Sequence, residues 1–473
     1  MKTLRLIFLI FSCCGLLFSC SEFGMPDDDL ADVDLKKASK TAAFVVEPSG
    51  GDDTPALMQA FEDAKAAGQG SVVQLCEGEY HLGLMEIRDF YGFIKGKGKD
   101  KTIITVNTGL DAQVLLDAQL YPDLVKFVGG DVKLSDFTIQ TPVGKICDTG
   151  PALGHIRSMF NFSANNAQYE LGNTERCINV VVDNVAVKGR FFAEGPGYYQ
   201  NNFNCLFGIR TGWDCLSGND LPREKINIEI TNSEFDKLCY GVLLEAMNES
   251  KAVIGKKNNG NCFTDNDKAG GIYECRATEF LFEGNAVNIP EYCYGWDVDD
   301  ASYYQILKYE PEVNASLANI QFNAFNLMHS EYALRFYNER QFFYDETPIA
   351  CQIRNNQFNM KDGYEWSIIS VATNGMVIRN NKFTGHGDFA MVHNYSTYGL
   401  ALGNNFSTAS FETGVAYLTE STQNWTFVGG NFTDKVIDLG VNNVFTGMNV
   451  STSDAPLGRS ISEKLVPMNH LMK

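Results

Sequence analysis

Four ionisable side chains fall at equivalent places in three similar segments, which span residues 240–245, 294–299 and 332–337. Successive residues of a β-strand point to opposite faces of its sheet. We therefore expect the apolar residues of each segment to face a core and the intervening residues to face outward. The expected outward residues are Leu243, Glu245, Asp297, Asp299, Arg335 and Tyr337.

On neighbouring strands, these outward residues would form two columns, Leu243–Asp297–Arg335 and Glu245–Asp299–Tyr337. Adjacent strands lie about 4.8 Å apart, and alternate residues of one strand about 6.6 Å apart. Glu245 and Asp299 would then approach the carboxylate spacing of a retaining glycosidase, about 5–5.5 Å. Asp297 and Asp299 would approach the spacing of an inverting one, about 6.5–9.5 Å.

Asp297, Asp299 and Glu245 are therefore candidate catalytic acids, with Arg335 as the base or charge-neutralising group of a lyase. This chemistry requires no cofactor, although the same carboxylates are suitable ligands for Ca²⁺. The alternative is an ordinary cross-strand ion pair between Asp297 and Arg335 on a solvated face. The sequence leaves both interpretations open.

Three long segments interrupt the regular pattern near these residues, at 250–271, 301–316 and 339–350. Loops that break a repeat commonly gather on one face, which is often the binding face. Tyr303 and Tyr304 lie in the second segment and, together with Tyr337, are candidates for stacking on sugar rings.

The elements that would hold such a site follow from an internal repeat. Arg354-Asn355-Asn356-Gln357-Phe358 and Arg379-Asn380-Asn381-Lys382-Phe383 are near copies that lie 25 residues apart, and related turns recur along the second half of the chain. A period of about 23–26 residues with an apolar strand before each Asn predicts one coil of a parallel β-helix. Asn tolerates a left-handed turn, and its amides can hydrogen-bond along the axis. The Phe residues are expected to point inward and stack.

The start of the predicted solenoid has its own pattern. Thr54 is the expected N-cap and Pro55 the first residue of a helix over 55–67, which stops at Gly68. Strands are predicted at 71–76, 80–82 and 101–106.

This N-terminal string resembles the pectate-lyase-like superfamily. The resemblance rests on Asp52-Asp53-Thr54, Cys76-Glu77-Gly78-Glu79-Tyr80 and Gly96-Lys97-Gly98. It implies an all-β protein, a single-stranded right-handed parallel β-helix with a helix covering its N-terminal end. No catalytic signature of that superfamily can be transferred to this chain.

The first 20 residues resemble a bacterial lipoprotein signal. Basic Lys2 and Arg5 precede an apolar run at 6–18, which is too short to span a membrane, and Leu17-Phe18-Ser19-Cys20 resembles a lipobox. The expected organisation is a signal peptide at 1–19, an acidic tether at 20–40 after lipidated Cys20, a β-helix at 41–448 and a tail at 449–473. The acidic tether resembles the surface-export signal of Bacteroidetes lipoproteins, so we expect a lipid anchor in the outer membrane and display on the cell surface.

The net charge is −20, which argues against nucleic acid as a partner. Membrane contact is expected through the lipid anchor only. Close cysteine pairs such as Cys262 and Cys275 are candidates for disulfides in an oxidising compartment. The leading hypothesis is a polysaccharide lyase or glycoside hydrolase on the cell surface. The alternative is a non-catalytic carbohydrate-binding or adhesive protein, because fold alone implies no activity.

Overall fold

The computed structural model describes most of the predicted solenoid. The described residues are 42–107, 122–142, 156–164, 177–190, 205–212, 225–244, 250–264, 266, 269–288, 305–309, 317–327, 332–337, 350–361, 366–371, 373–430, 435–448 and 450–452. All of them belong to one compact unit, which comprises residues 40–473.

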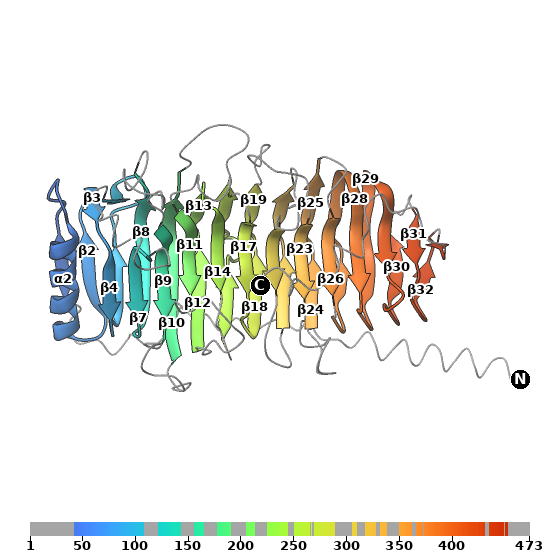
Figure 1. Ribbon diagram of the computed structural model, residues 1–473, viewed down its shortest axis with the longest axis horizontal. Coiled ribbons are helices and arrows are strands. Elements are labelled where there is room, and N and C mark those ends of the chain that lie inside the picture. The colour runs from blue at the N-terminus through green and yellow to red at the C-terminus, as the bar shows by residue number, and fades with distance from the viewer. Residues whose placement is uncertain are drawn as a thin grey trace, which may run out of the picture. The chain divides into compact units, whose positions relative to one another are not determined.

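The chain winds into a right-handed parallel β-helix, as the repeat and the resemblance predict (Figure 1). Each strand pairs in parallel with the equivalent strands of the coils before and after it, so three sheets run along the axis.

Sheet one contains, in stacking order, β1 (Ala43–Val46), β2 (Ser71–Leu75), β5 (Gly92–Lys95), β8 (Val132–Gln140), β10 (Cys177–Lys188), β12 (Lys225–Thr231), β15 (Lys251–Ile254), β18 (Glu279–Glu283), β21 (Leu317–Gln321), β24 (Ala350–Arg354), β27 (Val377–Arg379), β29 (Leu400–Leu418), β30 (Thr426–Gly430) and β32 (Val444–Thr446). The long strands β8, β10 and β29 continue around a corner, so their later residues belong to the next sheet.

Sheet two contains β3 (Gly78–Leu82), β6 (Thr102–Val106), the second parts of β8 and β10, β13 (Glu234–Asp236), β16 (Cys262–Thr264), β19 (Ala286–Asn288), β22 (Ala324–Asn326), β25 (Gln357–Met360), the first part of β28 (Lys382–Asn394) and the middle of β29.

Sheet three contains β4 (Met85–Arg88), β7 (Val125–Val128), β9 (Ile156–Ser163), β11 (Cys205–Thr211), β14 (Tyr240–Leu244), β17 (Ala269–Cys275), β20 (Gln305–Tyr309), β23 (Tyr332–Tyr337), β26 (Trp366–Val371), the last parts of β28 and β29, β31 (Val436–Asp438) and β33 (Val450–Ser451).

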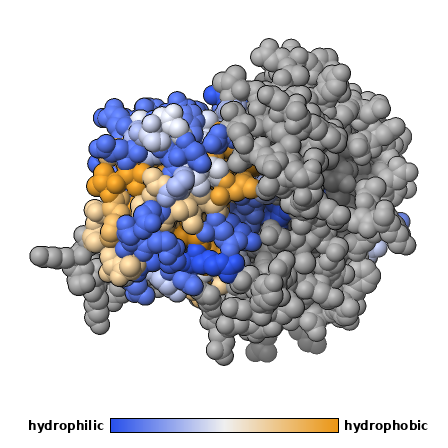
Figure 2. Space-filling model, turned by 60° about the vertical axis from the view of Figure 1, so that its left-hand side comes forward, coloured by the Kyte–Doolittle hydropathy of each residue, from blue (hydrophilic) through white to orange (hydrophobic). Residues whose placement is uncertain are grey.

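A helix covers the N-terminal end of the solenoid (Figure 1). The helix α2 (Thr54–Ala67) buries Leu57, Phe61 and Ala64, and the Phe61 ring meets the edge of Phe90 at 5.1 Å between centroids. The predicted N-cap is wrong, because Asp53 occupies that position and Thr54 is already helical. The Asp53 carboxylate instead accepts hydrogen bonds from the backbone N–H groups of Ser49 and His81, which ties the helix start to β3. The surface seen toward this end mixes hydrophilic and apolar residues, with hydrophilic ones more widespread (Figure 2).

The corner between sheets one and two confirms the predicted roles of Asn. Asn232, Asn355 and Asn380 adopt left-handed φ values of 52°, 57° and 54°. In the pairs 355–356 and 380–381 the second Asn has a different function, because its side-chain Nδ2 donates to the Oδ1 of the Asn one coil further along. This buried ladder comprises Asn261, Asn285, Asn323, Asn356, Asn381 and Asn404.

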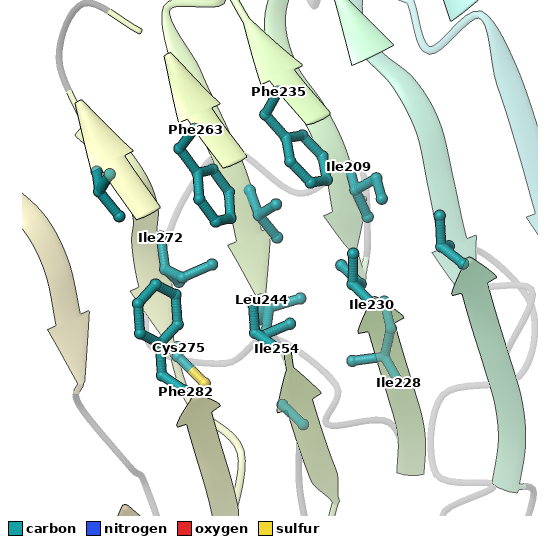
Figure 3. Packing of buried hydrophobic residues seen from close by; sticks show 14 of the residues in the cluster. Ile209, Ile228, Ile230, Phe235, Leu244, Ile254, Phe263, Ile272, Cys275 and Phe282 are labelled. Atoms are coloured by element: carbon teal, nitrogen blue, oxygen red, sulfur yellow. The ribbon is translucent and has the colours of Figure 1, made fainter. Parts of the chain in front are cut away.

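Stacked Phe rings fill the interior beside this corner, as predicted. Phe358 and Phe383 lie 4.8 Å apart between centroids with an interplanar angle of 7°, and Phe383 continues to Phe406 at 4.7 Å. Phe235 and Phe263 form the same contact at 4.9 Å, beside Ile and Leu side chains from the other two sheets (Figure 3). Each coil therefore buries its apolar face against its neighbours, and the core grows one layer at a time.

Candidate functional site

Most of the predicted site residues cannot be placed. Glu245, Asp297, Asp299, Tyr303, Tyr304 and Cys20 all lie outside the described residues. Arg335 and Tyr337 lie on β23, and the side chain of Arg335 is described. The predicted catalytic and lipidation sites therefore stay predictions.

The assumption that the three aligned segments are immediate neighbours is wrong. Strand β14, which carries Leu243, pairs with β17, then β20 follows, and only then β23 with Arg335. Two of the three presumed inserts also contain regular strands, since 250–271 includes β15 and β16 and 301–316 includes β20. Asn261-Cys262-Phe263 has the same Asn–x–Phe spacing as Asn323-Ala324-Phe325 and indicates a further coil within 250–271.

The predicted alternation is correct in the first and third segments, while the second, 294–299, lies outside the described residues. Val242, Leu244, Leu334 and Phe336 belong to the buried core, so Leu243 and Arg335 lie on the outer face of sheet three. The paired registers extend this position along the axis. We call the resulting residues the outer row: Glu86, Lys126, Asn161, Arg210 and Leu243 on consecutive strands from β4 to β14, and Arg335 on β23.

The outer row is rich in cationic residues although the chain is strongly acidic. Lys126, Arg210 and Arg335 all occupy it, and the net charge of the chain is −20. Arg210 is 5% exposed and Arg335 is 9% exposed. Guanidinium groups that are this well removed from bulk water interact strongly with any anion that reaches them.

A second row of equivalent positions on sheet three carries aromatic residues. The rings of Phe207 and Tyr240 stack at 5.0 Å between centroids with an interplanar angle of 18°, and both side chains are half-buried. The same register position is occupied on the following strands by Ala269, Gln305, Tyr332, Trp366 and Phe389, and Phe389 is fully buried. We call these positions the aromatic row.

Small residues let the coils approach closely behind the aromatic row. A Cβ at Gly208 would lie 2.8 Å from the carbonyl oxygen of Gly241, so a larger residue would push the two strands apart. Ile209 and Val242 follow these glycines and are fully buried. Each strand therefore contributes a core residue two positions after its stacked ring.

An acid lies beside the start of both rows. Asp123 accepts hydrogen bonds from Ser158 Oγ at 2.6 Å and from Asn161 Nδ2 at 2.7 Å. Asn161 is fully buried, and its Oδ1 finds no hydrogen-bond partner among the described residues. Burial raises the pKa of the nearby Cys205 thiol, and the Asp123 charge raises it further. Asp123, Asn161 and Arg210 therefore form a polar cluster next to the stacked rings.

This face combines a carboxylate, guanidinium groups, an amide and aromatic rings. Such a set can bind a sugar polymer through ring stacking and hydrogen bonds, and an acid beside cations can take part in proton transfer. Sequence reasoning missed Asp123, Asn161, Phe207 and Arg210, because their coils do not repeat the Asn–x–Phe turn that guided the alignment.

No metal centre emerges from the described part of the chain, where no three His, Cys, Asp or Glu side chains gather to hold an ion. Cys262 and Cys275 are both free thiols, so the suggested disulfide between them is wrong. None of the helices in the described ranges has the length and apolarity needed to cross a bilayer.

Comparison with known proteins places several sugar-active proteins among the similar structures. The A-module of a mannuronan C-5 epimerase from Azotobacter vinelandii matches with 12% identity, 85% coverage of this chain, 96% of that chain and a TM-score of 0.48. A surface protein and adhesin of Streptococcus pneumoniae matches with 12% identity, 86% and 98% coverage and a TM-score of 0.43. A mannuronic acid specific family 6 polysaccharide lyase from human gut microbiota matches with 14% identity, 90% coverage of both chains and a TM-score of 0.30.

No protein-family model and no curated protein matches the sequence. The strand pairing itself defines the class, which is a right-handed parallel β-helix with a helical N-terminal cap. At these identities and TM-scores, the similar structures assign no activity to this chain.

Proposed function

We propose that this protein acts on a polysaccharide that lies along the outer face of sheet three. The observation that carries the proposal is the presence on sheet three of two sets of residues that run along the axis, one with Lys126, Arg210 and Arg335 and the other with the half-buried, stacked rings of Phe207 and Tyr240. A linear polymer is the ligand whose shape matches rows that extend along the axis.

The charge distribution favours an acidic polysaccharide. An acidic chain repels polyanions over most of its surface. Cationic residues that recur along one row, on strands about 4.8 Å apart, would provide a local path for carboxylate-bearing sugars. The aromatic rings would pack against the apolar faces of the same sugars.

The proposed reaction is lyase or hydrolase chemistry, as the sequence predicts. Asp297, Asp299 and Glu245 remain the proposed acids, with Arg335 as the base or charge-neutralising group. Asp123 is a further candidate for proton transfer, because it accepts hydrogen bonds from Ser158 and Asn161. The register partners of these two residues on β11 are Phe207 and Arg210. Ca²⁺ remains a candidate cofactor, which would reduce the electrostatic repulsion between acidic sugars and the carboxylates of the protein.

A second candidate function is carbohydrate binding without catalysis. It is favoured by one observation: both carboxylate oxygens of Asp123 already accept hydrogen bonds, from Ser158 and Asn161. A carboxylate held in this way is well suited to organise a binding face.

We further propose that lipidation of Cys20 anchors the protein in the outer membrane and displays the β-helix at the cell surface. Cys20→Ser should shift the protein from the membrane fraction to the soluble fraction and abolish incorporation of labelled fatty acid. Retention of the label would contradict this proposal.

The decisive experiment exposes the purified protein to polygalacturonate, alginate and a neutral glucan, with and without Ca²⁺. Binding is measured by calorimetry, and turnover is measured as unsaturated product and as reducing ends. We expect an acidic polymer to bind, and Arg210→Gln to weaken binding about tenfold. Lys133→Gln is the matched control, because Lys133 lies on the outer face of sheet one between core residues Val132 and Leu134.

The outcomes separate the two functions. Unsaturated product indicates a lyase, and new reducing ends without it indicate a hydrolase. Binding without either product favours the non-catalytic alternative. If none of the three polymers binds, both the catalytic and the binding function are contradicted for these polymers.

A further inference from the structure

Two exposed tyrosines lie on the turn that joins the sheet-three part of β28 to β29. Tyr395 is 50% exposed and Tyr398 is 65% exposed, in a described surface with few large apolar side chains this open. Tyr395 directly follows Asn394, the last residue of β28, and Tyr398 comes three residues later, so the turn begins at the edge of sheet three.

Both tyrosines adopt left-handed backbone conformations, with φ of 51° at Tyr395 and 53° at Tyr398. Bulky residues rarely adopt this conformation, which brings their Cβ close to the backbone. The position of Tyr398 is occupied by Gly375, Asn424 and Asn442 in the neighbouring coils, as the bridges through Thr397 establish. A ring therefore replaces the residue types that fit this backbone best, and such strain is typical of functional sites.

The turn is held firmly in place. The Thr397 N–H donates to the Thr373 carbonyl at 2.8 Å, and the Tyr398 N–H donates to the Gln423 carbonyl at 3.1 Å. The buried Ser396 hydroxyl lies 2.9 Å from Ser370 Oγ. Neighbouring coils thus fix the turn on both sides, and little backbone entropy is lost when a ligand binds to the rings.

Polar groups accompany the rings. The Oδ1 of Asn394 accepts hydrogen bonds from the hydroxyls of Thr419 at 2.8 Å and Ser421 at 3.0 Å. The Ser421 Oγ also accepts from the Tyr395 N–H at 3.2 Å. Aromatic faces beside an amide and hydroxyls are a combination that recognises sugars, which present an apolar ring face and hydroxyls on its rim.

We propose that Tyr395 and Tyr398 form a distal binding site for a sugar unit of the polysaccharide. This inference rests on the proposed function of sheet three. Six strand spacings separate β11, which carries Phe207, from β28, which places the site roughly 29 Å along the axis at about 4.8 Å per strand. Only a chain long enough to reach from the stacked Phe207 and Tyr240 rings to this turn would contact both.

The test compares oligosaccharides of three and nine units, prepared from whichever polymer of the panel binds. In the double variant Tyr395→Ala/Tyr398→Ala, we expect the Kd for the nine-unit chain to rise about tenfold, while the Kd for the three-unit chain is unchanged. Tyr398→Gly alone should weaken nine-unit binding in the same direction. Its melting temperature should equal or exceed that of the wild type, because glycine accepts the left-handed backbone.

Phe322→Asn is the matched control, because Phe322 is also left-handed and 40% exposed but lies at the corner between sheets one and two. Unchanged nine-unit binding in the tyrosine variants, or an equal loss for both lengths, would overturn the distal site and leave the proposed function standing. A wild-type protein that binds neither length would overturn both.

Discussion

Tyr240 stacks on Phe207 across two adjacent coils of sheet three, with ring centroids 5.0 Å apart. Most aromatic stacks described in this β-helix lie in the interior, where they support the coils. This pair is half-buried and directly precedes the residues that return to the core. Its position allows a flat apolar ligand to pack against the exposed parts of the rings.

Replacement of both rings, Phe207→Ala with Tyr240→Ala, should weaken polysaccharide binding about tenfold. Calorimetric titration measures the change. Phe93→Ala is the control, because Phe93 is also half-buried and lies on the outer face of sheet one. Equal effects of the two replacements would assign the loss to general destabilisation.

Asp299→Asn tests the catalytic acids predicted from the sequence. The substitution removes the charge and conserves the size of the side chain. We expect product formation to be abolished while the melting temperature stays within the experimental error of the wild type. Unchanged turnover would move the active site elsewhere, and Asp123→Asn would then be the next variant to assay.

Asn356→Ala should destabilise the β-helix more than any exposed Asn substitution. The Asn356 amide donates to the Ile320 carbonyl and to Asn381 Oδ1, and its Oδ1 accepts from the backbone and side chain of Asn323. Removal leaves several buried groups without partners, which costs about 3 kcal/mol or more. Urea unfolding measures the loss.

Asn405→Ala is the control for this variant, because Asn405 is exposed and accepts one local hydrogen bond from the Ser407 N–H. We expect a change within about 0.5 kcal/mol of the wild type. Similar losses in the two variants would contradict a special role for the buried ladder.

His393 makes the stability of the C-terminal coils dependent on pH. The side chain is fully buried, its Nδ1 lies 2.6 Å from Ser370 Oγ, and its ring stacks 3.8 Å from Trp425 between centroids. Burial lowers the pKa of His393 from 6.5 to about 3. The unfolded chain therefore binds a proton near pH 6.5 that the folded chain binds only near pH 3.

The neutral imidazole contributes its full stability above pH 6.5, and that contribution falls by about 1.4 kcal/mol for each pH unit between 6.5 and 3. Unfolding free energies at pH 7, 6 and 5 should therefore decline less steeply in His393→Gln than in the wild type. Parallel pH profiles of the two proteins would contradict this assignment, since all other titrating groups are shared.

Much of the fold can be predicted from the sequence, because successive coils repeat the same corner residues and the same inward-facing side chains. The Asn-Asn pairs at 355–356 and 380–381 specify a left-handed corner followed by a buried amide, and Phe358 and Phe383 must follow them into the core. The pattern of α2 is equally local, although its N-cap is not. The Asp53 side chain binds to His81, and that contact depends on β3.

Which coils are adjacent along the axis is decided by the tertiary structure. The coils differ in length, so only the observed strand pairing shows how many coils separate two segments. Leu243 and Arg335 were correctly expected on one outer face, but β17 and β20 lie between their strands. Phe207, Arg210 and Asp123 have no repeated spacing, so only the folded chain brings them together. The sequence by itself thus determined the periodic core, through side-chain alternation and corner chemistry, while the stacking of unequal coils decided which side chains share the outer face.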